Sequence, residues 1–273
     1  MSVNPNANIE RRFVTTMNRL IRAMNKAIEK AATPQEAIHL LTLYAQSQEY
    51  KDWCKELATK ITTQVNQGVS KTWREAAAKA GRGSEIYKQI MADLKSPLGG
   101  VFWLKIKDNA NLIQTFPLNI STTLTQYIAA EGLKGRRSTD ILKDLVKKFP
   151  QTAISRLRLI ARTEVSKTQT ALTQARATAL GLHWYIWRTS EDERVRSSHD
   201  KMSGVLVHWE NPPSPEELVG AESCGKYHAG DIYNCRCYPE PIVNLDYVDF
   251  PAKVYYNGAI RKMSRKQFEK IIA

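Results

Sequence analysis

Cysteine is scarce in this sequence: 273 residues contain four, and three of them lie between residues 192 and 237. Long apolar runs are absent, since no stretch approaches the roughly 18–20 apolar residues that a membrane-spanning helix needs. The opening segment, MSVNPNANIERRF, has no apolar run of the kind found in secretory signals. We therefore expect a chain that folds in a cytosol, stays out of membranes, and keeps free thiols or binds a metal in preference to forming disulfides.

Common catalytic motifs are also missing. The sequence has no HExxH, GxSxG, P-loop or GxGxxG, so it lacks the usual marks of several large enzyme classes. Residue types suited to Cys–His catalysis or metal-assisted hydrolysis do occur, namely Glu164, Asp192, His199, Asp200 and Cys235, but only geometry can join them into a site. We expect no enzyme and no small-molecule substrate, with a metal-dependent, nucleic-acid-acting enzyme as the alternative.

Positive charge is what the chain has in excess. The net charge is +13, and residues 1–150 carry 23 Lys and Arg against 13 Asp and Glu. Such a field attracts polyanions because their counterions are released on binding, so nucleic acid or an acidic protein surface is an expected partner. The basic residues are spread out, however, and charge that serves only solubility is the alternative.

The first hundred residues read as helices. Apolar residues recur at three- and four-residue steps between Ile9 and Ile28, which predicts one amphipathic helix. Thr33-Pro34 separates it from a second helix over residues 34–65, where Cys54 falls on the apolar side and is expected to be buried. A third helix is predicted from about Lys71 to Leu94, ending at the SPLGG segment.

The rest of the chain mixes helix and strand. Two helical patterns flank the turn EGLKGRR, a long Ala-rich helix is predicted over residues 152–180 with Gly181 closing it, and short strands follow in HWYIWRTS, in KMSGVLVHW and after the last cysteines. The sequence therefore predicts an α+β protein. Its expected parts are a helical region over residues 1–100, a small α+β domain over 101–248 with a few short antiparallel strands, and a basic tail over 249–273.

The segment HAGDIYNCRCYPEP at residues 228–241 concentrates two thiols one residue apart between turn-forming residues. Structural zinc sites use four N or S ligands, often three cysteines and one histidine, and a Cys-x-Cys pair can supply two thiolates from one turn. The sequence therefore predicts one structural zinc ion as the possible cofactor. The preferred ligands are His199, Cys224, Cys235 and Cys237, with His228 as the substitute.

Two other readings of these thiols stay open. They could be buried and reduced in a small unit that is poor in aliphatic residues, or Cys224 could pair with Cys235 or Cys237 outside the cytosol. Cys235 and Cys237 are not expected to bridge each other, because residues at i and i+2 of a strand lie about 6.5–7 Å apart. All of these readings give the turn a structural role.

Two clusters of basic residues could contact phosphates or a partner protein. One surrounds Gly135 in the turn at residues 131–137, and the other follows the last predicted strand in RKMSRKQFEKII. The predicted contact residues are Lys134, Arg136, Arg137, Arg261, Lys262, Arg265 and Lys266.

The order of several segments resembles one family. IARTEVSKTQTALTQA is followed by W-x-T-S-x-D-E-R-V-R-x-x-H-D-x-x-x-G, a Pro-rich loop and HAGDIYNCRCYP, while LIQTFP at residues 112–117 and Gly135 stand upstream. This arrangement resembles the phage Mu F-like minor head proteins, also called head morphogenesis proteins, over roughly residues 105–240. The loop between Trp209 and Cys224 is long for that pattern, and Cys224 is not clearly part of it.

The resemblance implies a minor capsid protein of a tailed phage. Such a protein would dock on the portal protein inside the procapsid, contact other head proteins and the double-stranded DNA genome, and aid head assembly and DNA packaging or delivery. It would lie in the host cytoplasm during assembly and then in the virion, inside the capsid. A plain DNA-binding module is the remaining alternative.

Overall fold

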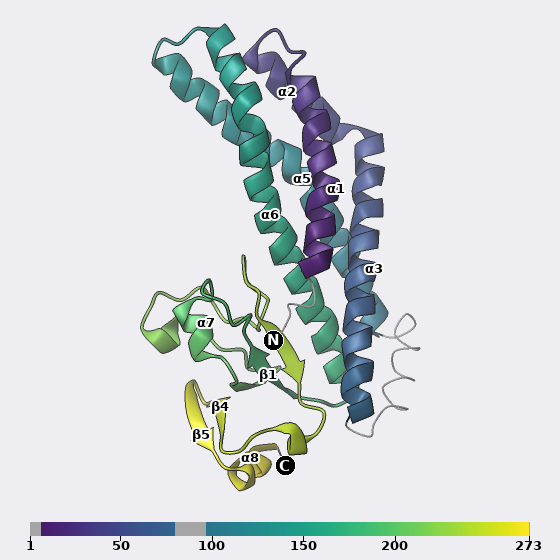
Figure 1. Cartoon of the computed structure of the whole chain (residues 1–273), viewed down its shortest axis with the longest axis vertical. Coiled ribbons are helices and arrows are strands. Elements are labelled where there is room, and N and C mark those ends of the chain that lie inside the picture. The colour runs from purple at the N-terminus through teal and green to yellow at the C-terminus, as the bar shows by residue number, and fades with distance from the viewer. Residues whose placement is uncertain (1–6, 80–96, 273) are drawn as a thin grey trace. The chain divides into compact units, whose positions relative to one another are not determined.

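The computed structural model describes residues 7–79 and 97–272, which divide between two compact units (Figure 1). The helical unit comprises Asn8–Thr63 and Trp103–Ala161. Among the described residues, the sheet unit comprises Ala7 and residues 64–79, 97–102 and 162–272. The predicted α+β class is confirmed, because helices dominate the described chain and its strands lie in one small sheet. The units interleave along the sequence, whereas the expected division ran simply from one part to the next.

The helical unit draws on five helices, four of which also supply residues to the sheet unit. They are α1 (Ala7–Ile28), α2 (Pro34–Gln46), α3 (Gln48–Lys79), α5 (Pro97–Leu133) and α6 (Ser138–Ala179). The predicted apolar stripe of α1 is buried, at Phe13, Met17, Leu20, Ile21, Met24 and Ile28. Cys54 is buried as predicted. Polar pairs also join α3 to α5: the Tyr50 hydroxyl donates to the Ile113 carbonyl at 2.7 Å, and the Asn109 amide donates to the Thr62 hydroxyl at 3.2 Å.

The prediction of one helix over residues 34–65 was wrong. Thr33 caps α2 by accepting from the Glu36 amide at 3.1 Å, and Pro34 takes the first helical position. The helix α2 then ends at Ser47, whose backbone is extended. The hydroxyl oxygen of Ser47 accepts a hydrogen bond from the Tyr50 backbone amide at 3.2 Å. Ser47 therefore caps α3, which continues through Lys71, where a new helix was expected. The predicted end near Leu94 lies outside the described residues.

Two expected helix boundaries near residues 100 and 150 were also wrong. The helix α5 begins at Pro97, inside the segment expected as a stop, and a single helix α6 runs through Pro150. Proline removes one backbone hydrogen bond, but buried residues continue across it at four-residue steps, at Ile141, Leu145, Phe149, Ala153 and Leu157. Packing of this stripe therefore outweighs the local cost of Pro150.

The end of α6 follows the sequence signal at Gly181. This glycine has φ +66°, and its amide donates to the Thr178 carbonyl at 3.0 Å while the Leu182 amide donates to the Ala177 carbonyl at 2.8 Å. Both bonds belong to the Schellman motif that stops helices and turns the chain. The chain passes from this cap directly into the first strand.

The sheet has five strands in the order β3-β1-β2-β4-β5. They are β1 (Trp184–Arg188), β2 (Leu206–His208), β3 (Tyr238–Pro241), β4 (Ala252–Tyr256) and β5 (Ala259–Met263). The strand β1 pairs antiparallel with β2 and β3, and β4 with β5, but β2 pairs parallel with β4 through Leu206 and Val254. The sheet is thus mixed, whereas only antiparallel strands were expected.

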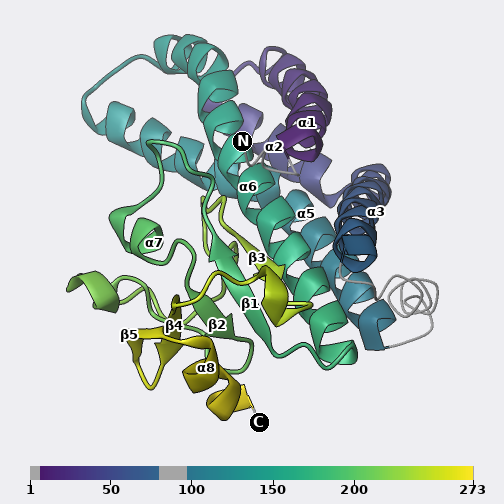
Figure 2. The ribbon, with the colours of Figure 1, turned by 60° about the horizontal axis from the view of Figure 1, so that its bottom comes forward.

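Residues 249–273, expected as a basic tail, contribute structure to this sheet. They form β4, β5 and the helix α8 (Arg265–Ile272), which lies beside the two strands in Figure 2. One apolar core joins them to the earlier strands, and its buried members are Ile186, Leu206, Ala252, Val254, Met263 and Phe268. None of the helices in the described part of the chain is long and apolar enough to cross a membrane.

Candidate metal centre

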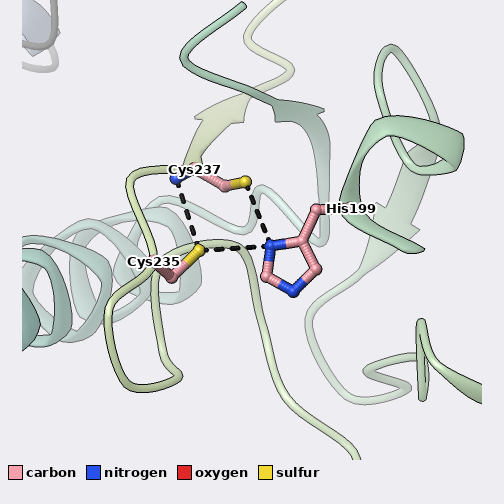
Figure 3. A group of neighbouring side chains, drawn as sticks. All are labelled: His199, Cys235 and Cys237. Carbon is pink, nitrogen blue, oxygen red and sulfur yellow. Dashed lines mark hydrogen bonds between the residues drawn. The ribbon is translucent and has the colours of Figure 1, made fainter. Parts of the chain in front are cut away.

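Three of the predicted ligands meet in the sheet unit: His199, Cys235 and Cys237 (Figure 3). The Nδ1 atom of His199 lies 3.4 Å from the Cys235 sulfur and 3.5 Å from the Cys237 sulfur. His199 comes from the short helix α7 (Ser197–Lys201), and the two thiols come from the turn that leads into β3. All three side chains are buried, between 2% and 3% exposed.

The helix α6 holds the thiol-bearing turn in place. The Ser166 hydroxyl donates to the Cys235 carbonyl at 3.1 Å, and the Thr163 hydroxyl accepts from the Asn234 amide at 2.9 Å. Gly230 lies against the same helix, because a Cβ atom there would stand 2.7 Å from both the Thr170 hydroxyl and the Cys237 carbonyl. The turn therefore depends on small and polar residues of α6 as much as on its own sequence.

A second chain of contacts fixes the orientation of His199. Its Nε2 atom lies 3.0 Å from the Tyr227 hydroxyl oxygen, and that hydroxyl donates to the Glu216 carboxylate at 2.6 Å. Because the hydroxyl proton is committed to Glu216, the hydroxyl oxygen can accept from Nε2–H of His199. In this arrangement Nδ1 is the ring nitrogen that keeps a lone pair, and it faces the two sulfurs. Such an outer contact on the second ring nitrogen is typical of metal-bound histidines.

The separations fit a tetrahedral ion. Bond lengths of about 2.3 Å to sulfur and about 2.0 Å to nitrogen, at tetrahedral angles, place the two ligand atoms about 3.5 Å apart. The observed distances of 3.4 and 3.5 Å match this value closely. Two thiolates and an imidazole are ligands that zinc prefers, so these residues could hold a zinc ion with one further position to fill.

The two thiols are inequivalent as acids. The contact with Cys237 lowers the pKa of Cys235, while the neighbouring Cys235 and burial raise the pKa of Cys237. One proton therefore leaves the pair readily and the second is retained. A bound cation would favour loss of both protons, which couples metal binding to pH.

Comparison with known proteins identifies the region that contains this site. The sequence model of the family described as "Phage Mu protein F like protein" matches residues 119–239, which include all three clustered residues. Residues 119–239 are therefore similar to phage Mu protein F. No solved structure gives a significant match to the chain.

Three relatives share parts of the sequence. An uncharacterized protein of Haemophilus influenzae is 30% identical over 159 residues, which are 58% of this chain and 32% of that protein. An uncharacterized protein of Methanocaldococcus jannaschii is 34% identical over 45% of this chain and 18% of its own. The minor head protein GP7 of Bacillus phage SPP1 is 30% identical over 40% of this chain and 36% of its own. The chain thus spans between 18% and 36% of the length of these relatives.

The other two predicted ligands lie apart from the clustered residues of the Mu F-like region. Cys224 is exposed, on the long loop between β2 and Tyr227, and is not in the group of residues that could share an ion. His228 is buried, but its Nδ1 atom contacts the Tyr185 hydroxyl at 3.2 Å and its ring packs against Trp209. Its side chain is thus engaged in the aromatic core.

Of the candidate catalytic residues, His199 and Cys235 lie together, but neither Asp192 nor Asp200 belongs to their cluster. Asp192 forms an ion pair with Arg236 through both guanidinium nitrogens, and Asp200 is exposed on α7. Glu216 and Tyr227, by contrast, contact His199 directly and were not predicted. They lie 17 and 28 residues after His199 in a loop of irregular spacing, so no periodic pattern could have pointed to them.

The basic residues proposed as contacts differ in their surroundings. In the turn after α5, Lys134 and Arg136 both pair with Glu131, at 2.8 and 2.7 Å, and Arg137 is exposed. At the C-terminus Arg265 pairs with Asp246 at 2.8 Å and with Glu269 at 2.9 Å. The other basic residues of these two clusters, Arg137, Arg261, Lys262 and Lys266, are exposed.

Burial of His228 predicts a loss of stability in acid. Burial lowers its pKa from 6.5 to about 4, so protonation favours the unfolded chain. The stabilising effect of the neutral ring is complete above pH 6.5 and declines as the pH falls toward 4. Between pH 7 and pH 4.5 the free energy of unfolding should fall by about 2 kcal/mol more in the wild type than in His228→Gln. Urea titrations at both pH values measure this difference, and parallel losses in both proteins would contradict it.

Proposed function

We propose that this chain is a minor head protein that acts in phage head morphogenesis. The observation that carries the proposal is the Mu F-like match over residues 119–239, supported by the similarity to a phage minor head protein. In this proposal the chain docks on the portal protein inside the procapsid, contacts other head proteins and the DNA genome, and remains inside the capsid. The excess of positive charge suits a protein held beside packaged DNA.

The cluster of His199, Cys235 and Cys237 serves this function as a structural metal site. A zinc ion there would join the turn before β3 to α7. The ion would thereby fix the long loop that carries Glu216 and Tyr227. We propose that the metal maintains the shape of the sheet unit for assembly and takes part in no reaction.

Purification from assembling particles tests the proposed function. An affinity-tagged chain, isolated from cells in which heads are assembling, should bring the portal protein and other head proteins with it. Particles made without the chain should be defective in head assembly, DNA content or DNA delivery. Normal, infectious particles in its absence, together with no recovery of any head protein, would contradict the proposal.

DNA contact is expected to depend on the basic C-terminal residues. Replacing Arg261, Lys262 and Lys266 by glutamine should weaken duplex binding and reduce the slope of log affinity against log salt by about 2 to 3. The matched control replaces three exposed lysines of the helical unit, Lys30, Lys55 and Lys60, and changes the net charge equally. Fluorescence anisotropy between 50 and 200 mM salt measures both. Equal effects of the two triple variants would show that only overall charge matters.

The number of ligands favours one second candidate function. Catalytic zinc sites commonly have three protein ligands and an open position, and three ligands cluster here among the described residues. A nucleic-acid-acting hydrolase would cleave DNA or RNA with added Zn²⁺, Mg²⁺ or Mn²⁺ and lose this activity in His199→Ala. Absence of cleavage with all three ions would exclude it.

A further inference from the structure

A small cleft of about 50 Å³ opens beside the three clustered residues. His199, Cys235 and Cys237 form part of its lining, so it adjoins the position that a fourth ligand of the metal would occupy. Its volume has room for one or two small polar groups. Whatever enters the cleft can therefore approach the metal directly.

Three arginines dominate the rest of the lining. They are Arg194, Arg196 and Arg236, and Arg236 pairs with the Asp192 carboxylate through two hydrogen bonds. Arg194 lies 3.6 Å from the same carboxylate and its side chain is 71% exposed. Arg196 donates to the Tyr233 carbonyl at 3.0 Å and lies over the Tyr233 ring. Three guanidinium groups against one carboxylate leave an excess of positive charge.

The metal itself would not cancel that excess. A divalent ion is neutralised by the two thiolates of Cys235 and Cys237, so the arginines keep their net charge when the site is loaded. No carboxylate or further thiol of the described chain joins the three ligands. The fourth ligand therefore comes from outside the described residues, and the surrounding charge favours an anion over neutral water.

We propose that this cleft binds a phosphate-type oxyanion, one oxygen of which takes the fourth position on the metal. Guanidinium groups match phosphate oxygens with paired, charge-assisted hydrogen bonds, and a doubly charged oxyanion gains more from several arginines than a carboxylate does. The small volume admits a free or terminal phosphate and excludes a whole nucleotide. This proposal rests on the metal site proposed above.

Cobalt substitution makes the fourth position visible. Co²⁺ occupies zinc sites, and its visible absorption changes when a ligand is exchanged. The full chain loaded with Co²⁺ and freed of excess metal is titrated with inorganic phosphate at constant ionic strength, kept with sodium chloride. The expected result is a saturable change of the visible bands at millimolar phosphate or below.

Matched arginine variants distinguish specific phosphate binding in the cleft from attraction by the overall positive charge. Arg194→Gln, an exposed cleft residue whose loss leaves the Asp192–Arg236 pair in place, should weaken the response to phosphate about tenfold. Arg261→Gln, an exposed arginine of β5 outside the cleft, should leave it unchanged. Both proteins should bind Co²⁺ as the wild type does, which shows that each is folded at the site.

The source of the phosphate is resolved in a second arm. An oligonucleotide with a 5′-phosphate is compared with the same strand ending in a 5′-hydroxyl. A change only with the phosphorylated strand supports a DNA end as the ligand, and a change with inorganic phosphate alone supports the free ion.

Three outcomes would overturn the proposal. If the visible bands do not change at phosphate concentrations up to the order of tens of millimolar, about tenfold above the physiological level, oxyanion ligation is excluded. The metal site itself is left intact by that result. A response to acetate as strong as that to phosphate shows that the cleft does not select oxyanions of higher charge. Failure of the chain to bind Co²⁺ at all removes the metal site and this proposal together.

Discussion

Replacing Cys235 by serine is expected to destabilise the sheet unit by roughly 4 kcal/mol or more when metal is present. The substitution removes one of three clustered ligands and leaves His199 and Cys237 around an ion that they can no longer hold tightly. It also places a serine hydroxyl at a buried position, where Cys235 is only 3% exposed. Amide hydrogen exchange at β1 reports the local free energy of opening and should show the loss directly.

Cys54→Ser provides the matched control. Cys54 is equally buried, at 1% exposed, but it packs in the helical unit, where burial raises its pKa to about 11 and keeps it a neutral thiol. Its replacement should cost only about 1 to 2 kcal/mol, measured by exchange at α3. Small and equal losses in the two variants would mean that Cys235 contributes no more than an ordinary buried thiol.

Replacing Phe268 by alanine is expected to lower the free energy of unfolding by about 3 to 5 kcal/mol. The side chain is fully buried, and its ring meets Trp184 edge-on at 5.0 Å between ring centroids. Through this contact α8 covers the core formed by β1, β2 and β4. The last 25 residues should therefore be required for folding of the sheet unit.

A neighbour on the same helix controls for that prediction. Ile272 is 42% exposed, so Ile272→Ala removes a residue of similar character at little cost, about 1 kcal/mol or less. Urea unfolding followed by tryptophan fluorescence measures both variants. Equal stability of Phe268→Ala and the wild type would mean that residues 249–273 do not contribute to the stability of the sheet unit.

Local sequence patterns correctly predicted the features that depend on residues close together in the sequence. The stripe of α1, the burial of Cys54, the strand β1 and the stop at Gly181 all follow from spacing or a single residue type. The failures share a cause, since each depends on distant packing. Pro150 reads as a break until its flanking stripe is seen to be buried, and the parallel pairing of β2 with β4 joins residues 48 positions apart.

The candidate site divides in the same way. The Cys-x-Cys pair and His199 stand out by residue type, and the structure brings them together. The sequence could not show that Cys224 and His228 lie outside the cluster, because the path of the loop over residues 209–227 determines their positions. Glu216 and Tyr227 were missed for that reason as well: the loop places them against His199, although nothing in their spacing does.

Metal content measures the central claim most directly. Elemental analysis of the purified full chain should find about one zinc per molecule, and Cys237→Ser should contain much less. Treatment with a chelator should lower the unfolding temperature of the wild type and leave that of Cys237→Ser nearly unchanged. A wild-type protein that carries no metal, takes up none from added Zn²⁺, and melts identically with and without the chelator would contradict the account.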